Sequence, residues 1–368
     1  MNPLPSPLIL IGVGGAGSAM ARGVMRAYGP GIRALAIDTD AGTGSAGDGV
    51  PFILLGGNRL AGRGTGGQPA SARASFQDNP SLIDPALGGA RIAVVVTALG
   101  GGTGGGATGE LLRHLHSLGI VSLLFATMPF GFEGEERMRV AKTSAGPICQ
   151  QADVSVILPL DQLVAGTDNM KDALAHGIDT LASGVTLLWR ILEKPGYISL
   201  DAERLRRILS GCGRARFGVA SATGEDRALQ VLKSLAESPL VGSDAARPPV
   251  RAILAGILGG DDLRLSEVGA ISSGLTAAFG EHATLDLGTV NDEATFSGRL
   301  VVVTLLFEES AVASPYGKDE PRGAASKAKG ERTALAPNSR FRHAEQTIWN
   351  GENLDVPTFY RRQLTLDI

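Results

Sequence analysis

Residues 97–106 read Thr-Ala-Leu-Gly-Gly-Gly-Thr-Gly-Gly-Gly and directly follow the apolar run at 92–96. The apolar run predicts a buried strand, and the leucines of residues 107–118 predict an amphipathic helix after the glycines. Glycines remove every Cβ from the turn between them, so backbone N–H groups can close around a phosphate beside the positive end of the helix. The stretch therefore predicts a phosphate-binding loop rather than a flexible linker, which a strand and a helix do not usually frame.

A second glycine loop, at residues 12–17, follows the expected strand 8–12. Its glycines fit the G-x-G-x-x-G fingerprint, and Asp38 ends the next apolar run about where a ribose-binding acid would lie. Taken alone, this pattern favours an NAD enzyme. A dinucleotide fold needs one phosphate loop, however, and this chain has a third glycine cluster at residues 62–69.

Composition places the chain among large globular proteins. It has 368 residues, 43% hydrophobic and 19% charged, with a net charge of −3, which allows two domains plus tails. The near-neutral charge does not indicate a nucleic-acid partner. Cys149 and Cys212 have neither metal nor disulfide spacing, which fits a reducing cytosol. We expect no direct membrane insertion, because no apolar run reaches the length of a membrane helix.

Strand and helix patterns alternate up to residue 160, which predicts a parallel sheet covered on both faces. The strands are expected at 8–12, 34–38, 51–55, 91–97, 121–127 and 154–158. Residues 168–193 predict one long helix that ends before Pro195 and Gly196. Further strands are expected near 216–221, 250–257, 284–290 and 299–307.

Several segments resemble, in order and spacing, the nucleotide loops of the tubulin/FtsZ family. They are Gly12–Gly17, Asp38–Asp40, Gly62–Pro69, Gly100–Gly106 and Phe130–Gly134. The Gly-Gly-Gly-Thr-Gly core at 100–104 is the specific signature of that family. Residues 218–228 resemble the segment after the family's central helix, and the resemblance runs from about residue 8 to about residue 308.

The resemblance implies an α/β fold of the tubulin/FtsZ type. A Rossmann-like parallel-sheet nucleotide domain that includes the long central helix would span residues 1–193, and a second, smaller α/β domain would span 194–309. Residues 310–345 lose apolar content and gain Ser, Ala, Gly, Lys and Arg, which predicts a disordered linker. Residues 346–368 would form a C-terminal docking peptide.

The resemblance also implies GTP or GDP as the ligand, together with Mg²⁺. Asp40 would reach the magnesium shell, and Glu133 and Arg137 match residues that hold the ribose and the phosphate side. The alternative for this last pair is an i,i+4 surface ion pair. No residue is assigned as a direct metal ligand. The expected nucleotide-binding residues are Gly14, Gly15, Gly17, Ser18, Asp38, Asp40, Gly64, Gly66, Gly101, Gly102, Thr103, Gly104, Glu133, Arg137 and Asn169.

Three positions depart from the family's guanine-reading pattern. Ala19 and Leu160 stand where the family has amide or carboxylate side chains, and Asn169 stands where an Asp would accept both guanine N–H donors. Asn can accept only one of them and offers a donor in the wrong place. The sequence therefore leaves base specificity open, while phosphate binding is expected.

The catalytic loop departs as well. The family hydrolyses GTP between subunits through a loop that reads Asn-x-Asp-x-x-Asp, and residues 199–204 here read Ser-Leu-Asp-Ala-Glu-Arg. Asp201 keeps the first acid, but Arg204 replaces the second, and a cation cannot accept a water proton. We therefore expect slow or absent hydrolysis. Two alternatives stay open: Glu203 replaces the acid by a one-residue shift, or Arg204 stabilises phosphate charge.

The C-terminal stretch 353–363 resembles the peptide by which FtsZ docks on its membrane tethers. Leu354, Val356, Phe359 and Tyr360 would be its apolar anchors, on a membrane-tethering adaptor of the FtsA type. Such a peptide orders on binding and gains affinity from many copies along a filament. The alternative is a tail that folds back onto its own domain.

Together these features favour an FtsZ-like cytoskeletal protein, cytoplasmic and at the division site. It would bind GTP between subunits and polymerise head to tail, with self and the adaptor as partners. A second hypothesis is a non-hydrolysing paralogue that modulates an authentic FtsZ or copolymerises with it. A distant third, an NAD-dependent oxidoreductase, lacks a catalytic His or Lys constellation near the loops.

Overall fold

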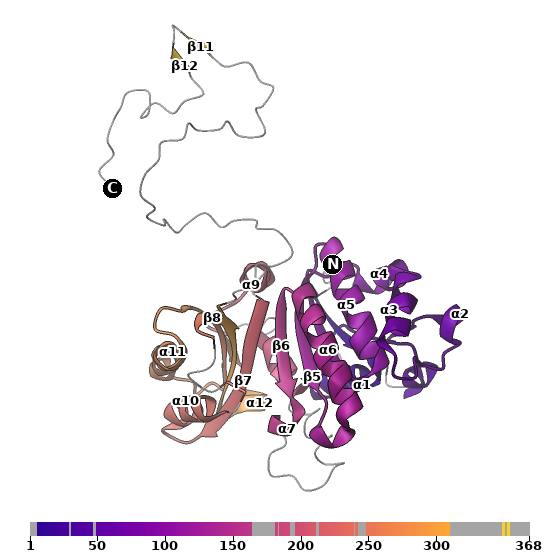
Figure 1. Cartoon of the computed structure of the whole chain (residues 1–368). Helices are drawn as coiled ribbons and strands as arrows, with labels where there is room; N and C mark the ends of the chain where they lie inside the picture. Colours follow the sequence, from indigo (N-terminus) through magenta and orange to yellow (C-terminus); the bar gives the residue numbers. More distant parts are fainter. Residues whose placement is uncertain are drawn as a thin grey trace. The chain divides into compact units, whose positions relative to one another are not determined.

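The computed structural model describes residues 6–28, 31–46, 49–163, 181–182, 184–191, 196–210, 213–238, 240–241, 248–309, 348–349 and 352–353. The chain forms two compact units, Met1–Lys318 and Asp319–Ile368. In the first unit the described strands form one sheet in the order β3-β2-β1-β4-β5-β6-β7-β10-β8-β9. Figure 1 labels four of these strands, β5, β6, β7 and β8.

The first part of this sheet is parallel and matches the strands expected from sequence. Its members are β1 (Leu8–Val13), β2 (Ala34–Asp38), β3 (Phe52–Leu54), β4 (Ile92–Ala98), β5 (Val121–Met128) and β6 (Val154–Pro159). Leu8 and Leu10 of β1 belong to one buried apolar cluster, whereas Ile9 and Ile11 belong to another. Alternate residues thus enter separate cores, so the sheet is covered on both faces, as continuous apolar strands require.

Helices between the strands cover these two faces. The longer ones are α1 (Gly14–Tyr28), α3 (Pro69–Gln77), α5 (Gly102–Ser117) and α6 (Glu135–Gln151). Short helical segments complete the connections: η1 (Ala41–Ala46), α2 (Gly57–Leu60), η2 (Pro80–Ile83), α4 (Asp84–Leu87), η3 (Gly131–Glu133) and α7 (Leu160–Leu163). This alternation confirms the α/β class predicted for the first part of the chain.

The two glycine-rich turns are themselves helical. The sequence pattern placed the start of the second of these helices at residue 107, but α5 begins at Gly102, and α1 likewise begins inside its glycine loop, at Gly14. A Cβ at Gly104 would lie 2.2 Å from the carbonyl oxygen of Ala98. Close contact with the preceding strand therefore outweighs the low helix propensity of glycine, and the expected start at residue 107 was wrong.

Residues 181–182 and 184–191 are helical and belong to the expected long helix. Leu181, Val185, Leu188 and Trp189 share one buried cluster with β1 and with strands of the second domain. This helix therefore contributes to the core between the two domains. The remainder of the range 168–193, including Asn169, lies outside the described residues.

The second domain has its own mixed sheet. It contains β7 (Gly213–Thr223), β8 (Val250–Gly259), β9 (Thr284–Asn291) and β10 (Arg299–Glu308), with α9 (Ala202–Leu209), α10 (Arg227–Glu237), α11 (Leu265–Phe279) and α12 (Glu293–Phe296). Strand β10 runs antiparallel between β7 and β8, and β9 lies parallel to β8. Among the described residues, two pairs, Val154–Gly213 and Ser155–Arg214, connect β7 to β6.

The second unit contains a described antiparallel pair, β11 (Ile348–Trp349) and β12 (Glu352–Asn353). The expected linker at 310–345 lies outside the described residues, as do the anchors Leu354, Val356, Phe359 and Tyr360.

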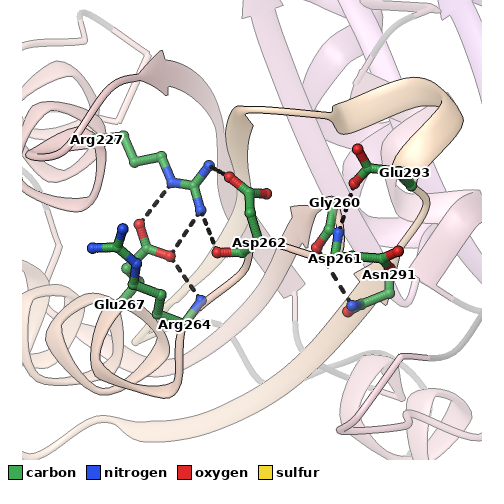
Figure 2. A network of polar contacts seen from close by, with 8 residues as sticks. All are labelled: Arg227, Gly260, Asp261, Asp262, Arg264, Glu267, Asn291 and Glu293. Carbon is green, nitrogen blue, oxygen red and sulfur yellow. Dashed lines mark hydrogen bonds and ion pairs between the residues drawn. The ribbon is translucent and has the colours of Figure 1, made fainter.

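A buried ion-pair network fixes one end of the second domain (Figure 2). Arg227 is only 4% exposed and grips Glu267 with two parallel bonds, Nε to Oε1 at 2.6 Å and Nη2 to Oε2 at 2.9 Å. Its Nη1 donates to Oδ2 of Asp262 at 2.6 Å. The guanidinium holds the pKa of Glu267 below its ordinary value. The network ties the start of α10 to the start of α11.

The loop between β8 and α11 is held from its other side as well. The Asp261 amide donates to Oε2 of Glu293 at 2.8 Å, and Nδ2 of Asn291 donates to the Gly260 carbonyl oxygen at 3.4 Å (Figure 2). These contacts connect the loop to the end of β9 and the start of α12. Hydrogen bonds and ion pairs therefore hold this loop in place from both sides.

We expect Glu267→Gln to lower the free energy of unfolding at neutral pH by about 2 to 3 kcal/mol, because Arg227 loses its buried anionic partner. Since folding lowers the pKa of Glu267, its contribution is full above the ordinary value near 4.3 and is lost as the pH falls through the lowered value. Denaturant unfolding at several pH values measures this difference.

The control is Glu237→Gln on α10, whose exposed carboxylate lies 3.9 Å from Lys233 Nζ and contributes about 0.5 kcal/mol or less. Equal losses in the two variants, or a Glu267→Gln deficit that does not shrink in acid, contradict the network's role.

Candidate functional site

A pocket of about 610 Å³ lies at the carboxyl ends of β1, β2, β4 and β5. This volume is typical of small-molecule sites. Strands β1 and β4 are neighbours, and the chain proceeds from β1 to β2 on one side and from β4 to β5 on the other. The pocket thus occupies the switch point at which parallel α/β sheets bind ligands.

Two helix N-termini line this pocket. Gly14 and Gly15 open α1, and Gly102, Thr103 and Gly104 open α5. The first N–H groups of a helix have no intrahelical partner and carry the positive end of the helix dipole. The pocket wall therefore presents backbone donors and partial positive charge to an anion such as a phosphate.

Glycine permits these elements to meet. Gly14 has φ +77°, and a Cβ there would lie 3.3 Å from the Gly104 amide nitrogen. A Cβ at Gly102 would lie 1.9 Å from Oγ1 of Thr65, in the third glycine loop. The three glycine-rich segments of the sequence therefore converge on one pocket, and side chains at these contacts would separate them.

The segment after β2 joins this arrangement through its polar side chains. The Thr39 amide donates to Oδ1 of Asp38 at 2.7 Å, and the Thr43 hydroxyl donates to Oδ2 at 2.7 Å. The Thr39 and Thr103 hydroxyls lie 2.8 Å apart, which links the segment to α5. Asp38 thus organises its own loop, whereas Asp40 is exposed on the pocket wall.

The segment after β5 forms another wall. Glu133 accepts from the Phe130 amide at 2.9 Å and pairs with Arg137, and both side chains line the pocket. Glu133 is 18% exposed and Arg137 is 59% exposed. The i,i+4 ion pair is therefore present, and both of its members line the pocket. Asp161 accepts from the Gly131 amide at 3.2 Å and supports the same segment.

Most residues expected at the nucleotide site come together here. The pocket is lined by Gly14, Gly15, Asp38, Asp40, Gly64, Gly66, Gly101, Gly102, Thr103, Gly104, Glu133 and Arg137. Gly17 and Ser18 are not among the described lining residues: a Cβ at Gly17 would lie 2.5 Å from the Val96 carbonyl oxygen, and Ser18 is fully buried. Gly17 thus allows α1 to approach β4.

The sequence analysis missed Thr127, which ends the predicted strand 121–127. The residue is in the pocket wall and is fully buried, and its Oγ1 has no hydrogen-bond partner among the described residues. The rule that ligands bind at the carboxyl ends of parallel strands was the signal that could have identified it.

The residues expected at the catalytic loop lie elsewhere and make contacts within the second domain. Asp201 caps α9 by accepting from the Arg204 amide at 2.6 Å. Glu203 accepts from Nε and Nη2 of Arg206 at 2.9 and 2.7 Å, and this cation lowers its pKa. Asp201, Glu203 and Arg204 are absent from the described lining of the pocket.

Helix α9 packs at the opposite, amino ends of the strands. Leu205 and Leu209 share a small apolar cavity with Leu8 and Ile92, the first residues of β1 and β4. Figure 1 shows α9 and α7 at opposite ends of β6. The pocket and the candidate catalytic residues of one chain are therefore at opposite ends of the strands.

Within the described ranges, no group of three or more His, Cys, Asp or Glu side chains could hold a metal ion. Among the helices of the same ranges, none is long and apolar enough to cross a membrane.

A pocket lined by two helix N-termini at the switch point of a parallel sheet is typical of Rossmann-like nucleotide-binding proteins. Comparisons with known proteins narrow this class. Residues 7–168 match the Tubulin/FtsZ family, GTPase domain, and residues 213–306 match the FtsZ family, C-terminal domain.

Individual relatives agree. The chain is 30% identical over 286 residues to "Cell division protein FtsZ" of Buchnera aphidicola, covering 77% of this chain and 74% of that protein. It is 28% identical over 332 residues to "Cell division protein FtsZ 2" of Rhizobium meliloti, covering 89% and 95%. An empty FtsZ dimer of M. jannaschii superposes with a TM-score of 0.74 at 25% identity, covering 81% and 87%.

The chain belongs to the tubulin/FtsZ family of cytoskeletal GTPases. Its fold confirms the resemblance drawn from the glycine loops. Membership of this GTPase family implies guanine-nucleotide binding, and membership of the FtsZ family implies self-association into filaments.

Gly101 offers a clean test of the pocket. It caps α5 at φ −92°, lines the pocket, and a Cβ there would have no described atom within 4 Å. We expect Gly101→Val to fold normally but to weaken GTP binding at least tenfold, because the side chain enters the space beside the first N–H groups of the helix. Isothermal calorimetry measures the affinity.

The matched control is Gly57→Val on α2, where a Cβ is also unobstructed and the residue is outside the described pocket lining. Gly102→Val is less informative, because its Cβ would strike Thr65 and displace a whole loop. If Gly101→Val folds and its affinity for GTP is unchanged, the phosphates do not bind at the N-terminus of α5.

Proposed function

We propose that the chain binds GTP at this pocket, assembles head to tail with the nucleotide between subunits, and acts in cell division. The observation that carries the proposal is the separation of the pocket from α9 by the length of the sheet. Groups on α9 can reach a nucleotide only in a neighbouring molecule. A filament that stacks the pocket end of one chain on the α9 end of the next brings them together.

The phosphates would lie against the N–H groups that open α1 and α5, at Gly14, Gly15 and Gly101–Gly104. Gly64 and Gly66 would close over the terminal phosphate. The donor set also fits Mg²⁺, which takes one or two carboxylates together with phosphate oxygens, and Asp40 is the exposed carboxylate on this wall. When bound, the ion neutralises charge on the transferred phosphoryl group.

The other end of the pocket would hold the nucleoside. Glu133 and Arg137 would contact the ribose and the phosphate side. Met20 and Leu160 supply apolar surface for a base. Guanine is proposed from family membership, because Ala19 and Leu160 offer no hydrogen-bonding side chain and Asn169 lies outside the described residues.

Hydrolysis is proposed to be slow. An effective loop needs a group that orients or deprotonates the attacking water. Asp201 is engaged as a helix cap, Glu203 is held by Arg206, and Arg204 has no acceptor. The same observation favours the second candidate, a non-hydrolysing paralogue that modulates or copolymerises with another FtsZ.

The C-terminal segment is proposed to dock on a membrane-tethering adaptor of the FtsA type and so to place the filament at the division site. The support is the resemblance of residues 353–363 to the family's docking peptide. Apolar anchors at Leu354, Val356, Phe359 and Tyr360 suit a short segment that orders on binding.

Sedimentation with parallel phosphate release tests the proposal. GTP with Mg²⁺ is expected to drive the protein into the pellet, whereas GDP is not, and phosphate is expected to appear slowly. A protein that binds GTP but stays in the supernatant at every concentration would contradict assembly. A protein that binds no guanine nucleotide would contradict the whole proposal.

We predict that Arg204→Asp raises phosphate release per sedimented subunit by about tenfold or more, since an acid then stands where a water must be oriented. The matched control is Arg207→Asp, an exposed position further along α9. Brisk hydrolysis by the parent, unchanged in Arg204→Asp, would show that the altered loop does not limit turnover and would favour Glu203 as the acid.

Removal of residues 346–368 is expected to leave GTP binding and sedimentation nearly intact while abolishing recruitment to adaptor-coated liposomes. Phe359→Ala should act similarly, because a buried aromatic anchor dominates such short interfaces, with Thr365→Ala as the matched control. Loss of sedimentation on truncation would show instead that the tail packs on the body and that the docking assignment is wrong.

A further inference from the structure

Strand β9 fixes the segment that leads into the catalytic loop. The Gly196 amide donates to the Thr289 carbonyl oxygen at 2.7 Å, and the Thr289 amide donates to the Ile198 carbonyl oxygen at 2.8 Å. The Ile198 amide donates to Oγ1 of Thr289 at 2.9 Å. Residues 196–198 are therefore attached to β9, and the position of the following loop is set by the second domain.

Another residue of β9, Gly288, also packs against this region. A Cβ at Gly288 would lie 2.7 Å from Cγ2 of Ile191 and 2.9 Å from Cδ1 of Leu200, so this face of the strand lies against the central helix and the loop. Alternate residues of a strand share a face. Asp286 therefore lies on the same face, next to the position reached by the start of α9.

Asp286 captures Arg204 from this position. Nε and Nη2 of Arg204 donate to a single oxygen, Oδ1 of Asp286, at 3.1 and 2.7 Å. The guanidinium side chain is 47% exposed and the carboxylate 23% exposed. The Arg204 amide is bound to Asp201 as well. The side chain is thus directed back onto its own second domain, and its charge is compensated there.

We propose that Asp286 is a positioning residue that retracts Arg204 from the nucleotide of the neighbouring subunit. This inference rests on the proposed head-to-tail assembly around GTP. With the pair intact, the start of α9 presents a compensated charge to the neighbour's phosphates. Without Asp286, Arg204 is an unpaired cation facing those phosphates and strengthens the junction, since complementary charges across an interface favour association.

The experiment compares wild type with Asp286→Asn, a change of charge with little change of shape. The concentration at which GTP and Mg²⁺ drive sedimentation is expected to fall about three- to tenfold in Asp286→Asn, and the difference is expected to shrink at high salt. Asp286→Glu should restore wild-type behaviour. Asp261→Asn is the matched control, because it removes an equal charge from the β8–α11 loop.

The decisive arm repeats Asp286→Asn in an Arg204→Ala background. If Asp286 acts through Arg204, the gain disappears there, whereas a purely structural effect of Asp286 persists. GTP affinity and thermal unfolding of each variant confirm that the pocket and the fold are intact.

The outcomes separate the two proposals. If wild type sediments with GTP and Asp286→Asn sediments at the same concentration, this inference alone is overturned. It is also overturned if Asp286→Asn still lowers that concentration in the Arg204→Ala background. Wild type that fails to sediment with GTP overturns the proposed function, and this inference with it.

Discussion

The contact between the N-termini of α1 and α5 is the constraint on which the rest of the molecule depends. Gly14, with φ +77°, lies where a Cβ would be only 3.3 Å from the Gly104 amide, so the two helices start side by side at the switch point of the sheet. Both helices direct their unpaired N–H groups at one pocket. The glycines that lower helix propensity thus allow the close approach on which the proposed binding of phosphate by backbone N–H groups depends.

The position of this pocket determines which end of one subunit would face the next in the proposed filament. A pocket at the carboxyl ends of the strands leaves the amino ends to α9, whose Leu205 packs beside the first residues of β1 and β4. The pocket and α9 therefore lie at opposite ends of the strands and cannot contact each other within one chain. In the filament proposed here, chemistry depends on the junction between subunits, and the second domain acts on that junction through β9.

The sequence was most informative where function constrains the backbone. The glycine loops predicted the pocket, and the apolar runs predicted every strand of the two domains. The start of α5 was misplaced, because glycine reads as a turn until tertiary contacts such as Gly104 against Ala98 are known. The Arg204–Asp286 pair joins residues 82 positions apart, so no local pattern could indicate it. Thr127 was similarly hidden in an apolar strand.

The most direct test of the central claim is a cryo-EM reconstruction of filaments grown with a slowly hydrolysed GTP analogue and Mg²⁺. We expect nucleotide density at every junction, with its phosphates against the start of α5 in one subunit and α9 of the next subunit facing them. Filaments with α9 on the outer surface, or with junctions that lack nucleotide, would contradict it.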